Sequence, residues 1–308
     1  MKSRKGIRDD RICTEQNRVN ELLNWKNKRH HTVLQIEGPW HVGKTHEVKK
    51  FVYSHYKQVV YVNLVRDEYG FEDLMLTDHF MREYCRNAGI GEYVDDESTV
   101  LVIDEIQERA NVYNAIRDLR EQLGCDIIVS GSYLARTVNS RDFFLPAGIA
   151  YLQMYPLSFK EFCRALNIED ILETISLKSE SKDEDYQKLE EAYQVYRKIG
   201  GYPLVVTTFI ESRQIDDCMV VLEDLIRTFT AESSRFFTNS TALSIFQEAY
   251  KAVLVQIAEE EKGTGKTFLE FVTNFVKDTV KEPVSRNEVR TAASWLLYSG
   301  IIGYCDLY

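Results

Sequence analysis

The sequence has no apolar stretch long enough to span a membrane, and its basic, then acidic N-terminus is followed by no apolar core of the kind a secretory signal carries. The six cysteines are scattered without any Cys-x-x-Cys pair, which favours reduced, buried thiols over a disulfide or zinc framework. Neither an internal repeat nor a low-complexity tract is visible. We therefore expect a globular protein of the cytoplasm, with no membrane span.

The formal net charge of −10 argues against a general attraction to nucleic acid, although it leaves a local basic face open. A hydrophobic fraction of 44% with 28% charged residues is ordinary for a globular protein. A chain of 308 residues is too long for one typical domain and suits about two or three.

Strand and helix patterns alternate along the first half of the chain. Apolar runs predict strands at 32–37, 59–64, 100–104, 126–130 and 150–154, and helix-type periods predict helices at 15–28, 44–56, 71–88 and 107–124. Such alternation requires crossover connections, and hence a parallel sheet covered on both faces. We expect residues 1–155 to form an α/β three-layer sandwich, and almost only helices from Pro156 onward.

Residues 38–45 fit the pattern G-x-x-x-x-G-K-[ST], and a predicted strand precedes them while a predicted helix follows. Backbone N–H groups and the positive end of the helix would bind phosphate, Lys44 would reach the β- and γ-phosphates, and the Thr45 hydroxyl would ligate Mg²⁺. We assign nucleotide binding to this loop and the next residue: Gly38, Pro39, Trp40, His41, Val42, Gly43, Lys44, Thr45 and His46.

The chain contains a second Gly-Lys-Thr, at 265–267, that serves as a control. Glu260 occupies the position of its first glycine, and the acidic, helical run 259–261 stands where a strand should be. We interpret it as a polar loop between helices.

Asp104 ends the most hydrophobic predicted strand, and Glu105 follows it directly. At the carboxyl edge of a parallel sheet, Asp104 would hold Mg²⁺ and Glu105, pointing elsewhere, would serve as the base that activates water. A kinase for small molecules normally needs no such glutamate, and the Asn-Lys-x-Asp run typical of GTPases is missing. The pair therefore favours hydrolysis of ATP.

The strand predicted at 126–130 ends in Ser130-Gly131-Ser132. A polar side chain at this strand end could sense the γ-phosphate. We assign that role to Ser130, although sequence alone does not separate it from Ser132, and a simple serine turn is the alternative.

These features resemble the prokaryotic AAA-like ATPases of STAND type, in which a helical lid and a winged helix follow the P-loop domain. Besides the loop and the acidic pair, the resemblance rests on Val129-Ser-Gly-Ser132, Met154-Tyr-Pro-Leu-Ser-Phe-Lys-Glu-Phe162 and Gly200-Gly-Tyr-Pro203. It implies a lid at 156–238 and a winged helix at 239–308. It also implies that Pro203 lies against the nucleotide and reports its state to the lid. Longer relatives continue into a nuclease-like domain of unknown function, and the chain stops where a wing would need its second strand.

The chain departs from this family at one place. Many relatives carry Gly-Arg, a candidate arginine finger, shortly before Pro-Leu-Ser-Phe, whereas this sequence has Gly148-Ile149. Arg136 and Arg141 lie nearby and are candidate substitutes, or simple surface charges.

The helical pattern of residues 241–308 also predicts a winged helix. Ser285 and Glu288 are expected to form a capping box before its final helix. Acidic residues outnumber basic ones in this segment, so attraction to DNA phosphates would be weak. We favour a regulatory or protein-binding role over DNA reading.

The sequence thus predicts a Mg²⁺-dependent ATPase, binding ATP or ADP, whose hydrolysis drives a conformational switch. The alternative is a nucleotide-gated regulatory or DNA-binding winged-helix module with negligible turnover. The expected partners are a protein, or a second copy of the chain, bound through the lid and winged helix.

Overall fold

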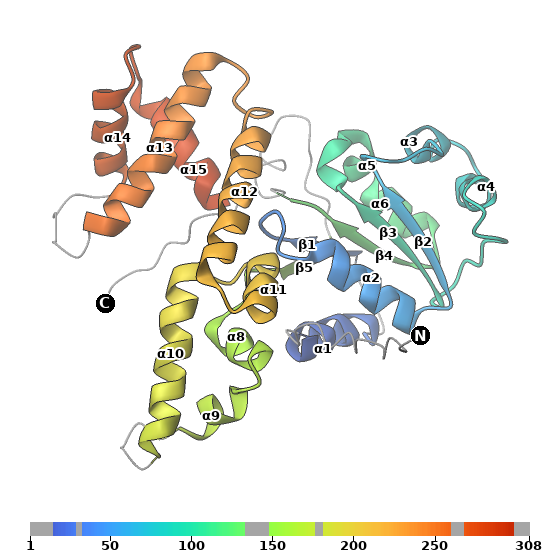
Figure 1. The fold of residues 1–308 in the computed structure, drawn as a ribbon. Coiled ribbons are helices and arrows are strands. Elements are labelled where there is room, and N and C mark those ends of the chain that lie inside the picture. The colour runs from blue at the N-terminus through green and yellow to red at the C-terminus, as the bar shows by residue number, and fades with distance from the viewer. Residues whose placement is uncertain (1–14, 29–32, 133–147, 176–180, 260–267, 299–308) are drawn as a thin grey trace, which may run out of the picture.

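The computed structural model describes residues 15–28, 33–132, 148–175, 181–259 and 268–298 (Figure 1). The described part of the first half is built on a parallel sheet with strand order β2-β3-β4-β1-β5. Its strands are β1 (Val33–Glu37), β2 (Gln58–Asn63), β3 (Thr99–Asp104), β4 (Asp126–Ser130) and β5 (Ile149–Gln153). All five strands and the parallel pairing confirm the sequence prediction.

Helices cover both faces of this sheet. Alternate residues of β3 point to opposite faces, so Val100 and Val102 pack with α1 (Glu15–Lys26) and α2 (Lys44–His55), as part of one buried cluster. Leu101 and Ile103 belong to the other cluster, with α4 (Phe80–Asn87) and the short helices that follow β3. The chain is therefore an α/β three-layer sandwich in this half, as predicted (Figure 1).

Two of the predicted helices are interrupted. The segment 71–88 forms α3 (Phe71–Leu74) and α4, because the Thr77 hydroxyl donates a hydrogen bond to the Leu74 carbonyl and competes with continuation of the helix. The segment 107–124 forms three short pieces, η1 (Ile106–Glu108), α5 (Ala110–Asn114) and α6 (Ile116–Gln122). The helical period of the sequence was right, but it did not show these breaks.

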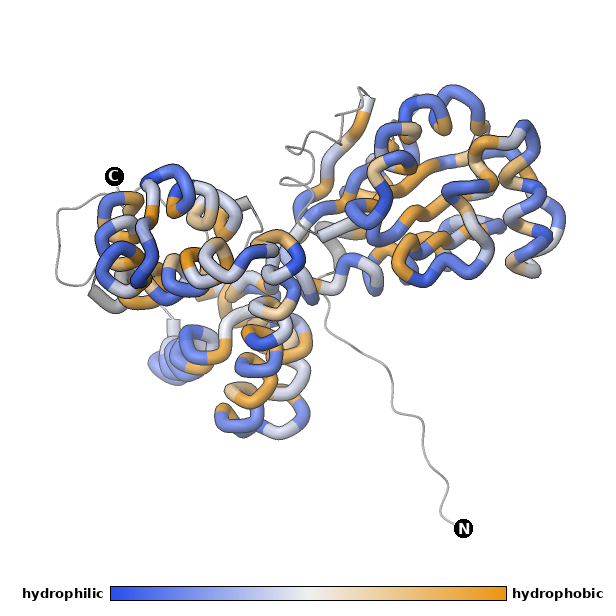
Figure 2. Tube along the Cα trace, turned by 90° about the horizontal axis from the view of Figure 1, so that it is seen from above, coloured by the Kyte–Doolittle hydropathy of each residue, from blue (hydrophilic) through white to orange (hydrophobic). Residues whose placement is uncertain are grey.

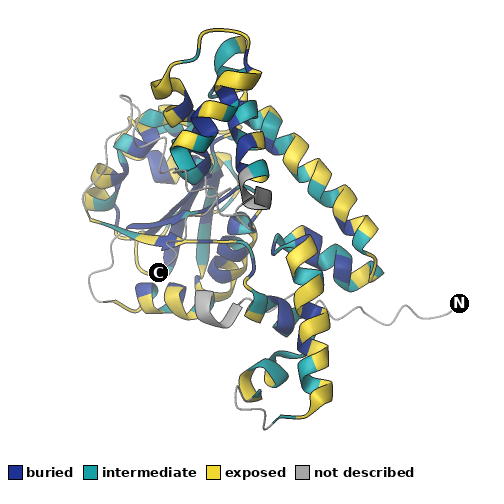
Figure 3. Cartoon of the chain, turned by 90° about the vertical axis from the view of Figure 1, so that its left-hand side faces the viewer, coloured by how far each residue is buried: buried dark blue, intermediate teal, exposed yellow. Residues whose placement is uncertain are grey.

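A helical unit follows the sheet. Its helices are α8 (Phe159–Ala165), α9 (Glu169–Thr174), α10 (Asp183–Ile199), α11 (Pro203–Ser212) and α12 (Ile215–Ser233). Ser158 and Glu161 form a capping box at the start of α8. The unit has its own buried cluster, which includes Phe162, Val206 and Cys218. Figure 3 shows these helices burying one side and exposing the other.

The last described unit consists of α13 (Ser240–Glu259), α14 (Phe268–Thr279) and α15 (Arg286–Tyr298). They pack around Trp295, which is 1% exposed and is surrounded by Phe229, Phe237 and Phe246. Phe229 belongs to α12, so this long helix joins the two helical cores (Figure 1). Figure 2 shows hydrophobic and hydrophilic residues interspersed along the helices.

The predicted capping box of α15 is present, since the Ser285 hydroxyl accepts the Glu288 N–H and the Glu288 carboxylate accepts the Ser285 N–H. The Gly-Lys-Thr at 265–267 lies outside the described residues. None of the helices in the described ranges combines the length and apolarity needed to cross a membrane.

Candidate functional site

The phosphate loop connects β1 directly to α2. Lys44 is the first residue of α2, and Gly43 precedes it with φ 91°. Gly38 leaves β1 so close to the Met154 carbonyl that a Cβ there would lie 2.3 Å from its oxygen. The predicted strand, loop and helix are thus all present, and the loop runs at the N-terminal end of α2, where backbone N–H groups and the helix dipole favour anions.

The Lys44 ammonium is held at the mouth of this loop. Its Nζ donates to the carbonyls of Gly38 (3.0 Å) and Pro39 (2.8 Å) and to the Ser132 hydroxyl (2.9 Å). Burial lowers the pKa of Lys44 to about 8, while Glu105 and Asp104 oppose that fall. A phosphate bound in the loop would meet a desolvated cation, whose attraction is stronger than at a surface.

The Asp104 carboxylate accepts hydrogen bonds from three hydroxyl groups. Thr45 Oγ1 donates to its Oδ2 at 2.8 Å, Tyr61 donates to the same oxygen, and Ser130 Oγ donates to Oδ1. Hydroxyl and carboxylate oxygens side by side suit Mg²⁺, which binds proteins through one or two such groups and takes its other ligands from phosphate and water. No cage of three or more His, Cys, Asp or Glu side chains occurs within the described ranges, so the ion would depend on substrate phosphates. Thr45 and Asp104 fit the role of the protein ligands to such an ion.

Glu105 lines a different cleft from Asp104. Its backbone adopts the left-handed conformation, with φ 58°. Gln107 Nε2 donates to the Glu105 carboxylate at 2.6 Å and fixes its direction. Burial raises the pKa of Glu105, and the bond from Gln107 opposes the rise. A carboxylate with a raised pKa is a better proton acceptor near neutral pH.

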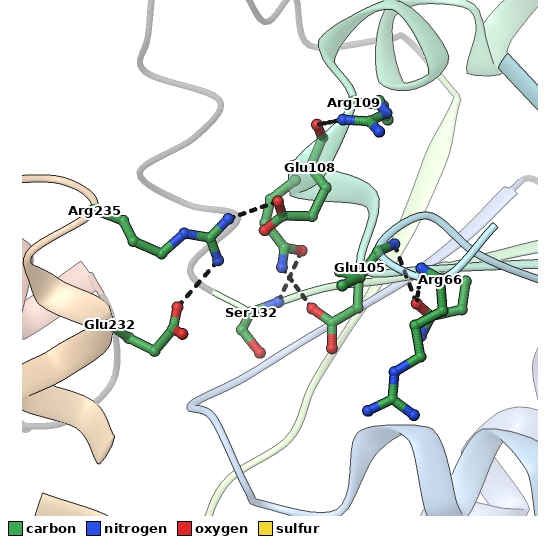
Figure 4. Close-up of polar contacts among 10 residues, drawn as sticks. Arg66, Glu105, Glu108, Arg109, Ser132, Glu232 and Arg235 are labelled. Carbon is green, nitrogen blue, oxygen red and sulfur yellow. Dashed lines mark hydrogen bonds and ion pairs between the residues drawn. The ribbon is translucent and has the colours of Figure 1, made fainter. Parts of the chain in front are cut away.

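The two carboxylates line two neighbouring clefts. The Asp104 cleft, of about 450 Å³, is lined by Thr45, Lys49, Tyr61, Arg66 and Asp104 among others. The Glu105 cleft, of about 240 Å³, is lined by Trp40, Arg66, Glu105, Ser132 and Arg235 among others. Figure 4 shows Glu105, Ser132 and Arg66 from the sheet on one side and Arg235 and Glu232 from the helical half on the other.

Arg235 connects these two sides. It follows the end of α12, and its guanidinium donates to Glu108 of η1 at 2.7 Å and to Glu232 at 3.1 Å (Figure 4). The ion pair with Glu108 therefore joins the helical half to the segment that begins with Glu105.

The sequence did not separate Ser130 from Ser132, and the structure gives them different partners. Ser130 binds Asp104, whereas Ser132 binds Lys44 through its hydroxyl and Gln107 through its N–H. The γ-phosphate sensor role assigned to Ser130 remains a prediction, and the contact with Lys44 makes Ser132 the serine nearer the phosphate loop.

The two later motifs of the resemblance, at 154–162 and 200–203, meet in space. The Leu157 N–H donates to the Gly201 carbonyl at 2.6 Å, and a Cβ at Gly201 would lie 2.0 Å from the Leu157 oxygen. Gly38 approaches Met154 in the same way, so residues 154–157 lie between the phosphate loop and the corner that starts α11. Pro203 is the first residue of α11 and is half-buried. Its role against the nucleotide remains a prediction.

Tyr202, the neighbour of Pro203, reaches toward the loop. It lines an apolar cleft of about 200 Å³ together with Trp40 and His41 of the loop and Phe229 of α12. Burial lowers the pKa of His41, and the charge of Lys44 lowers it further. Val42 is buried beneath the loop, and His46 is exposed on α2.

Three site residues escaped sequence reasoning: Arg66, Gln107 and Arg235. Gln107 follows Glu105 by two positions and was a visible signal in the run Asp-Glu-Ile-Gln. Arg66 and Arg235 gave no local signal. The candidate substitutes for an arginine finger, Arg136 and Arg141, lie outside the described residues, and Ile149 begins β5 beside Val33.

Comparison with known proteins finds a similarity in the sheet half. Residues 30–163 match the model of a family described as an AAA domain. A curated protein of Haemophilus influenzae, described as uncharacterized, is 29% identical over 110 residues. That stretch is 36% of this chain and 24% of the relative, so the match spans about a quarter of the relative's length.

Solved structures with a related chain path include the Walker-type ATPase of Pyrococcus abyssi, with 14% identity, a TM-score of 0.46 and coverage of 91% of this chain and 95% of that one. The ORC1 protein of Aeropyrum pernix, in complex with DNA, has 15% identity, a TM-score of 0.37 and coverage of 92% and 82%. The family match covers the phosphate loop, the Asp104–Glu105 pair and all five strands. Residues 30–163 are therefore similar to an AAA domain.

Proposed function

We propose that the protein binds ATP with Mg²⁺ and hydrolyses it, and that the state of the nucleotide sets the arrangement of the helical half. The observation that carries the proposal is the meeting of four side chains at one sheet edge: Lys44 and Thr45 from the start of α2, and Asp104 and Glu105 from the end of β3. The family of residues 30–163 supports it.

Each group has a distinct task in this proposal. Lys44 binds the β- and γ-phosphates, while Thr45 and Asp104 hold the metal. Mg²⁺, when bound, neutralises charge on the phosphate oxygens. Glu105, fixed by Gln107, orients a water molecule toward the γ-phosphorus and takes its proton.

The switch part of the proposal rests on two connections between the loop and the helices. The segment 154–157 lies between Gly38 and Gly201, so a shift of the phosphate loop would displace the corner before α11. The ion pair of Arg235 with Glu108 ties α12 to the segment beginning at Glu105. Both connections reach the half of the chain assigned to the lid (156–238) and the winged helix (239–308), a division that remains part of the proposal.

Release of phosphate by the wild type beside Glu105→Gln tests hydrolysis. We expect the wild type to exceed the variant by at least about 100-fold, in line with the usual contribution of a general base. The variant should still bind ATP, because its side chain keeps its size and hydrogen-bonding capacity. Equal background rates in both proteins would contradict the enzymatic part.

A second candidate is a nucleotide-gated regulatory module with negligible turnover, and the specific observation in its favour is Ile149 at the place where relatives carry an arginine. Its partner would be a protein or a second copy, met through the helical half, with DNA as the weaker alternative. Tight ATP binding without phosphate release, together with a nucleotide-dependent change in mass in solution, would favour this candidate. A DNA shift assay across a range of salt would test the alternative, since specific binding should persist above the non-specific background.

A further inference from the structure

Arg66 stands where the two clefts of the site meet. It lines the Asp104 cleft together with Thr45, and it also lines the Glu105 cleft together with Ser132. The first cleft holds the groups assigned to the metal, and the second holds the carboxylate assigned to the water. Arg66 thus lies at the border between the Asp104 cleft and the Glu105 cleft.

The backbone beneath Arg66 is fixed to the strand that carries Asp104. The Leu64 N–H donates to the Asp104 carbonyl at 3.0 Å, which continues the β2–β3 pairing by one residue. The Arg66 N–H then donates to the Asn63 carbonyl at 2.9 Å and to Asn63 Oδ1 at 3.2 Å. The side chain therefore starts from a closed turn, a short distance from the acidic pair.

Arg66 forms no ion pair with a carboxylate among the described residues. Within the described residues its guanidinium makes no hydrogen bond or ion pair, whereas Arg235 across the same cleft is held by Glu108 and Glu232. The nearby acids are engaged elsewhere: Asp104 accepts three hydroxyl groups and Glu105 accepts Gln107. Figure 4 shows Arg66 near Glu105, with no dashed line from its guanidinium to any labelled acid.

We propose that Arg66 is a catalytic residue that contacts the terminal phosphate of bound ATP and supplies, from within the chain, the positive charge of an arginine finger. The inference rests on the proposed function. In the reaction, the water oxygen forms a bond to the γ-phosphorus, and the bond from that phosphorus to the β–γ bridging oxygen breaks. The bond's electrons stay on ADP, and Glu105 takes the water proton. Arg66 stabilises the charge that spreads over the γ-oxygens as this occurs.

Substitution of Arg66 in the full chain tests the inference. Arg66→Ala should lower phosphate release by at least about 100-fold, toward the low end of the effect of arginine fingers, while the dissociation constant for ATP rises less than about threefold. Arg66→Lys should restore only part of the rate, because an ammonium lacks the planar fork of a guanidinium. Arg86→Ala, on the exposed side of α4, is the matched control and should match the wild type.

Addition of free guanidinium to Arg66→Ala separates a catalytic role from a structural one. Guanidinium would not restore the rate of phosphate release if Arg66 only supported the fold. We expect it to raise phosphate release of this variant and to leave Arg86→Ala unchanged. A rate for Arg66→Ala within about threefold of the wild type would overturn the inference while the proposed hydrolysis stands. A loss confined to ATP affinity, with an unchanged maximal rate, would overturn it as well. A wild type no faster than Glu105→Gln would overturn both the proposed hydrolysis and the role of Arg66.

Discussion

The two halves of the molecule differ in what they bury. Within the described residues, the sheet half buries eight polar or charged side chains, and the helical half buries only Ser233 and Thr273. The eight are Gln35, Lys44, Glu47, Thr99, Asp104, Asp126, Ser130 and Ser132. Lys44, Asp104, Ser130 and Ser132 lie at or beside the carboxyl edge of the sheet, whereas Thr99 and Asp126 begin their strands at the opposite edge. A buried charge costs stability unless it is paired and hydrogen-bonded, so the group at the carboxyl edge points to chemistry. The described helical half is held mainly by apolar contacts.

This contrast predicts that changes in the two halves have different consequences. Substitutions at the sheet edge should remove nucleotide chemistry with little loss of structure. Substitutions in the helical cores should loosen structure while the phosphate loop keeps its ligand.

The largest effect is expected for Lys44→Ala. Loss of the buried ammonium removes the cation that faces the phosphates, and the dissociation constant for ATP should rise at least about 100-fold. Calorimetric titration with ATP measures it, with Lys50→Ala on the exposed side of α2 as the control. Retained tight binding would contradict the whole assignment of the loop.

Trp295→Ala should give the largest loss of stability in the helical half. The indole is almost fully buried among phenylalanines, and truncation of such a side chain costs about 3–5 kcal/mol. Thermal unfolding should show an earlier transition for the helices, and ATP affinity measured below that transition should stay near the wild-type value. A parallel loss of ATP binding would show that the two halves do not separate as their burial suggests.

Ser285→Ala removes the hydroxyl of the capping box before α15. The Glu288 N–H loses its acceptor, and stability should fall by about 1 kcal/mol. Comparison of Ser285→Ala with Ser285→Asp by thermal unfolding is the check, because aspartate also caps helices. Equal losses in both variants would argue against the cap as the cause.

The smallest effect is expected where the halves touch. A double-mutant cycle of Arg235→Ala and Glu108→Ala should give a coupling energy of about 0.2–1 kcal/mol, since Arg235 is 53% exposed and Glu108 19%. The same cycle applied to the rate of phosphate release measures whether the contact reaches Glu105. Zero coupling in both quantities would leave residues 154–157 and the packing of Trp40 and Tyr202 to join the halves.

The sequence predicted most of the fold because the relevant signals are local. Apolar runs predicted each of the five strands that the structure describes, and the run Gly38 to Thr45 identified the phosphate loop together with its helix. Asp104 and Glu105 followed from the position of a strand end.

Contacts between distant segments explain what could not be predicted. The partners of Ser130 and Ser132 depend on where β4 lies relative to Lys44, which no local pattern contains. The approach of Gly201 to Leu157 joins two motifs that sequence reasoning had recognised only by resemblance. Arg66 looked like any charged residue after a strand until β2 was placed beside β3.

The left-handed backbone of Glu105 has a further consequence. A residue with a Cβ is disfavoured in that conformation, and only glycine adopts it freely. The fold therefore carries a local penalty at the residue assigned to activate water. Glycine at this position would relieve the penalty and remove the acid together, so thermal tolerance and turnover would change in opposite directions. Selection for thermal stability alone would thus act against the residue that we propose as the base.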